Sequence, residues 1–229
     1  NVSEGVEKID NYVFWECHAL KNVSLPSSLT FLGNNALSQC DGYETVKLPE
    51  NLETLSQGAF YNSKGLKSIK IPEKVTEIAA CLFQACPALE HVELHDGITS
   101  IGNNAFQGCP LKLLEIPDSV TTIGSNAFVG ATASLIGPQS LLTKIGTENT
   151  AKASAIYVTG DDVTSVDSIN ACKVFVLNGG IVAENALTTP TKTGAIFAGW
   201  YETADFSGSR VTGDTAEAGK VYYARWCTA

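Results

Sequence analysis

Hydrophobic positions recur along the first half of this chain with a period of 23 residues. Residues 75–97 (VTEIAACLFQACPALEHVELHDG) align position by position with residues 29–51 and 52–74. Residues 98–119 form a copy that is one residue shorter, and residues 6–28 form a degenerate one. A fixed period of this length is typical of a solenoid, in which each repeat packs mainly on its two neighbours. We therefore expect a β-rich solenoid.

The polar and apolar positions inside one copy predict short elements. Segments that alternate with period two indicate short parallel strands with one side inward: 46–48, 69–71, 92–94 and 114–116. A proline follows most of these strands, because it lacks the N–H that a ladder needs: Pro26, Pro49, Pro72 and Pro117. A Gly/Asn cluster and an Ala-Phe pair predict a tight turn and then a short helical turn. The rings of Phe60, Phe83 and Phe106 should form an internal column.

The acidic composition excludes some partners. The net charge is −9; residues 1–170 contain 10 basic and 19 acidic residues, whereas residues 171–229 contain 5 of each. Nucleic acid is not an expected partner, since binding to phosphates needs a basic surface. No apolar run approaches the roughly 20 residues of a membrane helix, so we expect no membrane insertion.

Four of the seven cysteines occupy one slot of successive copies: Cys17, Cys40, Cys86 and Cys109. The same slot holds Ser63 and Ala131 in other copies, which indicates a small buried position rather than a disulfide framework. A bridge between Cys17 and Cys40 is sterically conceivable if neighbouring coils pair as strands, and this point stays open. The cysteines show no metal-ligand spacing, and no metal or cofactor is expected.

The repeats resemble the BspA-type leucine-rich repeats of bacterial surface proteins. They share the pattern I-P-x-x-V-T-x-I-G-x-x-A-F-x-x-C over residues 6 to about 130. The resemblance implies leucine-rich repeats with short parallel strands over residues 1–170, with degenerate capping copies from about residue 131. Residues 155–158 and 163–166 are the expected last stacked strands.

From about Cys172 the 23-residue period ends, and strands are expected at 173–177, 195–201 and 220–226. The motifs N-G-G at 178–180, T-P-T-K-T-G at 189–194, F-A-G-W-Y at 197–201 and Y-A-R-W at 223–226 resemble the internalin-type B-repeat. That family implies a small β-grasp-like module over residues 171–229, on a bacterial surface protein. The segment 181–188 is shorter than in that family, and Ala195 stands where an aromatic residue is usual. The resemblance is therefore weakest over the first hairpin.

The outward positions of the predicted strands form the candidate binding face. If the alternate residues point inward, eight side chains share the opposite side of the sheet: Thr45, Lys47, Ser68, Lys70, His91, Glu93, Leu113 and Glu115. Such a surface suits an extended partner. An ordinary solvated sheet face would have the same composition, and the sequence does not separate the two.

Other candidate chemistry has a structural alternative in each case. His91, Glu93 and His95 share one side of a strand, but residues i and i+4 of a strand lie about 13 Å apart, too far for one ion. Cys17 beside His18 could form a thiol nucleophile, but the cysteine belongs to the inward column. Asp161 and Asp162 could bind calcium or simply lie in a solvated loop.

The C-terminal aromatic residues also allow two interpretations. They could form a sugar-binding platform or the core of a small module: Trp200, Tyr201, Tyr222 and Trp226. The resemblance favours a non-catalytic, monomeric, extracellular or surface-attached protein that binds a protein or glycan through the repeat face. The alternatives are a carbohydrate-binding or scaffold portion of a larger surface enzyme, and a structural spacer.

Overall fold

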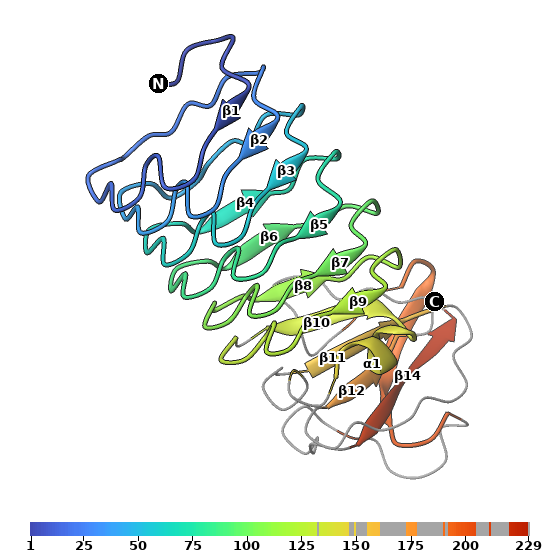
Figure 1. The fold of residues 1–229 in the computed structure, drawn as a ribbon. Helices are drawn as coiled ribbons and strands as arrows, with labels where there is room; N and C mark the ends of the chain where they lie inside the picture. The colour runs from blue at the N-terminus through green and yellow to red at the C-terminus, as the bar shows by residue number, and fades with distance from the viewer. Residues whose placement is uncertain are drawn as a thin grey trace.

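The chain forms a solenoid whose coils follow one another along a single axis (Figure 1). This computed structural model describes residues 1–131, 133–146, 149, 155–160, 173–177, 190, 192–204, 211 and 220–228. Each repeat of 22 or 23 residues makes one coil, and the coils share one hydrophobic core.

One parallel ladder runs along the V-T-x-I segment of the repeats, which the sequence pattern did not mark as a strand. Its two-residue strands form two three-stranded sheets: β1 (Lys8–Ile9), β2 (Phe31–Leu32) and β3 (Thr54–Leu55), then β5 (Glu77–Ile78), β7 (Ser100–Ile101) and β9 (Thr122–Ile123). Two residues are too few to show an alternation of period two, so only the stacking of coils reveals this ladder.

The predicted I-x-I strands form the second ladder. It contains the paired strands β4 (Ser68–Lys70) and β6 (His91–Glu93), and then, in a second sheet, the paired strands β8 (Leu113–Glu115) and β10 (Ser134–Pro138). The isolated parallel bridges Ser24–Lys47 and Thr45–Ser68 continue it toward the N-terminus. The central residue of each short strand is buried, and the residues beside it face outward.

The segment between the two ladders is a turn with left-handed residues, so the expected short helical turn is wrong. Asn35 has φ +52° and Gln39 has φ +55°, and the corresponding residues of later coils repeat this conformation. Alternate N–H groups bond locally and to the next coil: Ala36 donates to Gly33 at 3.2 Å, whereas Leu37 donates to Ala59 at 2.9 Å. The turns therefore form a third intercoil ladder.

The phenylalanine column is confirmed. The rings of Phe60, Phe83, Phe106 and Phe128 stack with centroids 5.6–5.7 Å apart and interplanar angles of 4–15°. All four side chains are completely buried.

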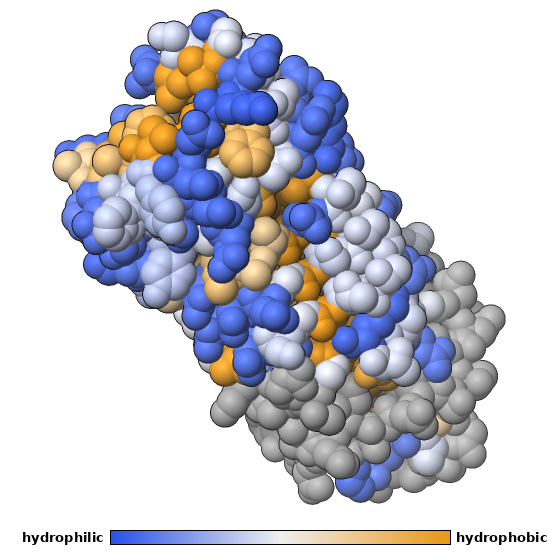
Figure 2. Space-filling view, in the orientation of Figure 1, coloured by the Kyte–Doolittle hydropathy of each residue, from blue (hydrophilic) through white to orange (hydrophobic). Residues whose placement is uncertain are grey.

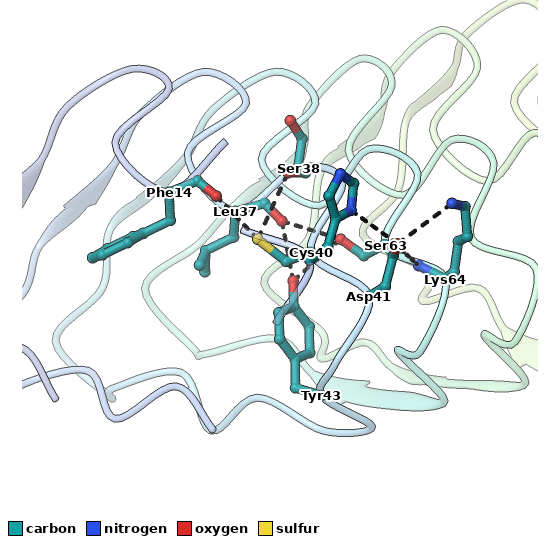
Figure 3. Close-up of polar contacts among 9 residues, drawn as sticks. Phe14, Leu37, Ser38, Cys40, Asp41, Tyr43, Ser63 and Lys64 are labelled. Carbon is teal, nitrogen blue, oxygen red and sulfur yellow. Dashed lines mark hydrogen bonds and ion pairs between the residues drawn. The ribbon is translucent and has the colours of Figure 1, made fainter. Parts of the chain in front are cut away.

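The cysteine slot is small and is buried at Cys40, Cys86 and Cys109, as expected, whereas Cys17 in the first coil is partly exposed. The buried slot also donates hydrogen bonds. The thiols of Cys40, Cys86 and Cys109 each point to a carbonyl of the preceding coil at 3.0 Å. Ser63 does the same with its hydroxyl, which donates to Leu37 O at 3.1 Å beside Tyr43 (Figure 3). Cys17 and Cys40 are free thiols, not a disulfide.

The second ladder continues without interruption into the C-terminal part. Strands β11 (Ala155–Thr159), β12 (Val174–Val176), β14 (Val221–Thr228) and β13 (Ala195–Tyr201) follow β8 and β10 in one six-stranded sheet. All its pairs are parallel except β13–β14, which is antiparallel at the edge. The strands expected at 155–158, 173–177, 195–201 and 220–226 are thus confirmed, whereas residues 163–166 and 178–180 lie outside the described residues.

The helix α1 (Leu141–Lys144) is a single turn, and Asn149 beyond it closes the turn ladder with its side chain. Phe128 N–H donates to Asn149 Oδ1 at 3.0 Å, the bond that a backbone carbonyl of the next coil makes elsewhere. Asn149 Nδ2 donates to Gly124 O at 3.1 Å and to Ile145 O at 2.7 Å. The buried amide thus replaces part of a following coil.

Asn149→Asp should lower the free energy of unfolding by about 2 kcal/mol or more at neutral pH, because two buried donors are lost and a charge is buried. Urea unfolding followed by circular dichroism measures this change. The matched control is Asn126→Asp, the same change at an exposed site, which should stay within about 0.5 kcal/mol. Equal effects of the two substitutions would show that Asn149 does not cap the stack.

Candidate interaction face

The eight predicted residues do lie on one side of the second ladder. We call this surface the strand face: Thr45, Lys47, Ser68, Lys70, His91, Glu93, Leu113 and Glu115. Parallel register places Ser68 beside His91 and Lys70 beside Glu93, with Val92 beneath them in the core. In the orientation of Figure 1, hydrophilic residues cover most of the visible repeat surface, with narrow hydrophobic patches between them (Figure 2).

The strand face is shallowly hollowed at its centre. A depression of about 340 Å³ is lined by Thr45, Val46, Lys47, Ser68, Ile69, Lys70, His91 and Glu93. Two further depressions, of about 450 and 570 Å³, adjoin it and are also lined by Lys47. A partner seated there would meet hydroxyl, imidazole, ammonium and carboxylate groups.

The charges of the strand face change sign along the solenoid axis. Successive coils present Lys47, Lys70, Glu93 and Glu115 at equivalent outward positions. Lys70 bonds to Glu93 in the middle of this row, and this hydrogen bond raises the pKa of Lys70. Among the described residues, Lys47 and Glu115 have no ion-pair partner, so the two ends of the row keep opposite charges.

A second row of alternating charge borders the strand face. Glu44, Lys67, Glu90 and Lys112 occupy one slot of successive coils. Lys67 lies 2.6 Å from Glu44, and Lys112 lies 2.7 Å from Glu90. The hydrogen bond from Lys112 lowers the pKa of Glu90. These exposed pairs join neighbouring coils.

Hydrophobic packing ends the strand face at its C-terminal side. In β10 the outward position Ser134 is buried but polar. The outward positions that follow are apolar and buried, and they form a second core: Ile136, Ala155, Tyr157, Phe175, Leu177, Trp200, Tyr222 and Ala224. Leu113 packs against this second core, while Glu115 remains exposed. The hollowed part of the face therefore extends over the coils that carry Thr45 to Glu93, and Glu115 is an exposed carboxylate at its C-terminal border.

The C-terminal aromatic residues form this second core rather than a sugar platform. Trp200 and Tyr222 are 4% and 1% exposed. Trp226 Nε1 donates to Leu177 O at 3.0 Å, and its ring contacts Phe197. Tyr201 is partly exposed, with the Arg225 guanidinium 5.8 Å from its ring centre.

The histidines are not brought together as metal ligands. His95 Nε2 bonds to Val75 O at 3.0 Å, its Nδ1 accepts the Gly97 N–H, and the Glu73 carboxylate lies 3.2 Å from Nδ1. His91 instead lies 3.8 Å from Glu90. The part of the chain that the structure describes contains no group of three His, Cys, Asp or Glu residues placed to hold a metal.

The neighbouring Cys17 and His18 are also not arranged as a catalytic pair. His18 Nδ1 donates to Asp41 at 2.9 Å. Lys64 bonds to the same carboxylate at 3.4 Å (Figure 3). Asp161 and Asp162 lie outside the described residues.

Comparison with known proteins identifies the repeats. Six copies of the BspA-type leucine-rich repeat region match residues 7–136, more than half of the chain. The chain belongs to the BspA-type leucine-rich repeat family. No curated protein matches it. Among the described residues, no helix is both long and apolar enough to cross a membrane.

Solved structures share this fold at low sequence identity. A leucine-rich cell surface protein from Faecalibacterium prausnitzii is 22% identical with a TM-score of 0.56, covering 75% of this chain and 52% of that protein. A leucine-rich repeat protein from Bacteroides ovatus is 20% identical with a TM-score of 0.52, covering 77% and 48%. The chain thus spans about half the length of these two solved proteins.

The thiols of the BspA-type coils should differ sharply in reactivity. Burial raises the pKa of Cys40 to about 11, and a hydrogen bond with Cys109 together with burial raises the pKa of Cys86. In the native protein at about pH 8, iodoacetamide should label partly exposed Cys17 and Cys81 but not Cys40 or Cys86, because the thiolate is the reactive form.

Peptide mass spectrometry measures the labelling at each position. In guanidinium chloride all four thiols should react at similar rates, which is the control. If Cys40 of the native protein were labelled as fast as Cys17, the thiol of Cys40 would not be buried as the structure shows.

Proposed function

We propose that this chain is a non-catalytic interaction module whose strand face binds a partner protein. The observation that carries the proposal is the polar hollow across Thr45, Ser68 and His91, bounded by ends of opposite charge. A shallow, open face of this kind suits recognition of an extended surface more than turnover of an enclosed substrate. We propose no cofactor and no enzymatic activity.

The partner should present an acidic group to Lys47 and a basic group to Glu115. These two residues are three coils apart, which is roughly 14 Å at about 4.8 Å per paired strand. An extended segment rises about 3.3 Å per residue, so its two charged residues would be about four positions apart. Complementary charge of this kind fixes the orientation of a partner and speeds its association.

An extracellular or bacterial surface location is also a proposal. It is supported by family membership and by the similar protein from F. prausnitzii, which is described as a cell surface protein. The assignment of residues 171–229 as a separate B-repeat-like, β-grasp-like module remains a proposal, as does a monomeric state. In this proposal the C-terminal part holds the strand face at a distance from whatever follows it in the full protein, or connects the two.

A selection from random peptides of about twelve residues tests the strand face. Peptides enriched on the immobilised wild-type chain should bind Ser68→Arg at least about tenfold more weakly, because the new side chain fills the centre of the hollow. Lys47→Glu should weaken binding most at low salt, since screening reduces surface charge effects. Biolayer interferometry measures both.

The matched control is Thr54→Arg, an exposed strand position on the other ladder, which should leave binding unchanged. Circular dichroism checks that each variant is folded. If the selected peptides bind Ser68→Arg as well as they bind the wild type, the strand face is not the binding surface.

A further inference from the structure

The most exposed large apolar side chains of the repeats all belong to the turn of the first coil. Tyr12 is 56% exposed, Val13 52% and Trp15 47%. The rings of Tyr12 and Trp15 contact each other edge to face, with centroids 6.1 Å apart and an interplanar angle of 78°. Two nearly perpendicular rings of this kind leave aromatic faces exposed on the surface.

Comparison with later coils shows which of these side chains point sideways. Val13 corresponds to Ala36, Ala59, Ala105 and Ala127, which are completely buried, so its exposure belongs to the end of the stack. Tyr12 corresponds to partly exposed Asn35, and Trp15 corresponds to partly exposed Tyr61 and Gln84. The two rings therefore project from the side of the coil, away from the stacking direction.

The backbone that carries the rings is fixed by the intercoil ladder. Tyr12 N–H donates to Asn34 O at 2.9 Å, and Glu16 N–H donates to Ser38 O at 3.1 Å. Trp15 N–H also closes a local turn on Tyr12 O at 3.2 Å. A ligand could therefore stack on the rings without first ordering this backbone.

Tyr61 extends the aromatic surface along the solenoid. It occupies the Trp15 slot two coils further on, with the small, buried Ser38 between them. Neighbouring coils place equivalent rings 5.6–5.7 Å apart in the phenylalanine column, so two coils correspond to about 11 Å. This spacing is comparable to the length of a disaccharide unit.

The chain next to the rings supplies hydrogen-bonding groups. Asn11 and Asp10 directly precede Tyr12, Glu16 follows Trp15, and Asn34 lies beside Asn11, whose Oδ1 accepts the Asn34 N–H at 2.7 Å. Amides and carboxylates both bind hydroxyl groups. The two carboxylates would repel sulfated or carboxylated ligands.

We propose that Tyr12 and Trp15 form a platform for an uncharged oligosaccharide, with Tyr61 as a second contact along the same chain of sugars. The C–H groups of a pyranose ring pack on an aromatic face, while the rim amides and carboxylates bind its hydroxyls. A protein contact would favour a broad apolar surround, and the rim here is polar. This site lies on the turns and is independent of the strand face.

Titration with neutral hexasaccharides tests the platform: cellohexaose, chitohexaose, xylohexaose and maltohexaose, at up to about 10 mM. Trp15 is the most exposed of the described tryptophans, so binding should change the fluorescence of the wild-type protein saturably for at least one sugar. Trp15→Ala should weaken binding roughly tenfold or more, measured by calorimetry. Tyr61→Ala should weaken binding of the hexasaccharide more than binding of the matching disaccharide, because only the longer sugar reaches from Trp15 to Tyr61.

Val13→Ala is the matched control, because it removes an equally exposed apolar side chain of the same turn without touching the rings. It should leave sugar binding unchanged, and a heparin-derived hexasaccharide should not compete. The proposal is overturned if no neutral hexasaccharide binds saturably or if binding survives Trp15→Ala. An equal loss in Val13→Ala also overturns it, since that marks a general apolar contact such as a protein interface.

Discussion

Hydrogen bonding between equivalent positions of successive coils is the constraint on which this structure depends. Two strand ladders, each divided into two or more sheets, and one turn ladder connect neighbouring coils, so a coil satisfies much of its backbone only beside a copy of itself. Side chains also interact with equivalent positions of neighbouring coils. Phenylalanine rings stack on one another, and a thiol or hydroxyl donates a hydrogen bond to a carbonyl of the preceding coil. Where the repeats end, Asn149 supplies one of these bonds from a side chain.

The surfaces of the protein follow from the same register. Because equivalent residues align in columns, substitutions at one slot produce a row of changing chemistry along the axis. The strand face changes from Lys47 to Glu115 in this way, and the turn edge changes from the rings of Tyr12 and Trp15 to the amides of later coils. A solenoid can therefore carry separate interaction surfaces on different sides of one rigid core.

Much of this could be predicted from the sequence because the period marks equivalent positions. Alternation within each copy predicts that Ile69 and Val92 point inward and that Lys70 points outward. Alignment of the copies predicts the column that contains Phe83. The V-T-x-I ladder was missed, since two residues cannot show a period. The sequence predicts that the cysteine slot is small, and the exchange of cysteine with Ser63 is the signal that the slot also donates a hydrogen bond. The aromatic residues Trp200 and Tyr222 allowed a core as one of two interpretations, but the strand pairing behind the second core was not predictable. β12 pairs with β14 although β13 lies between them in the sequence, and no local pattern records that contact.

Deletion of one complete coil tests the central claim most directly. A chain without residues 52–74 should fold into a shorter solenoid, with a similar circular dichroism spectrum per residue and cooperative urea unfolding, because Leu29–Asn51 and Val75–Gly97 then become neighbours in register. A chain without residues 52–63 should not fold cooperatively, because every column beyond the deletion is displaced. If the full-coil deletion unfolds the protein, or if both deletions behave alike, columns of equivalent residues do not hold this structure together.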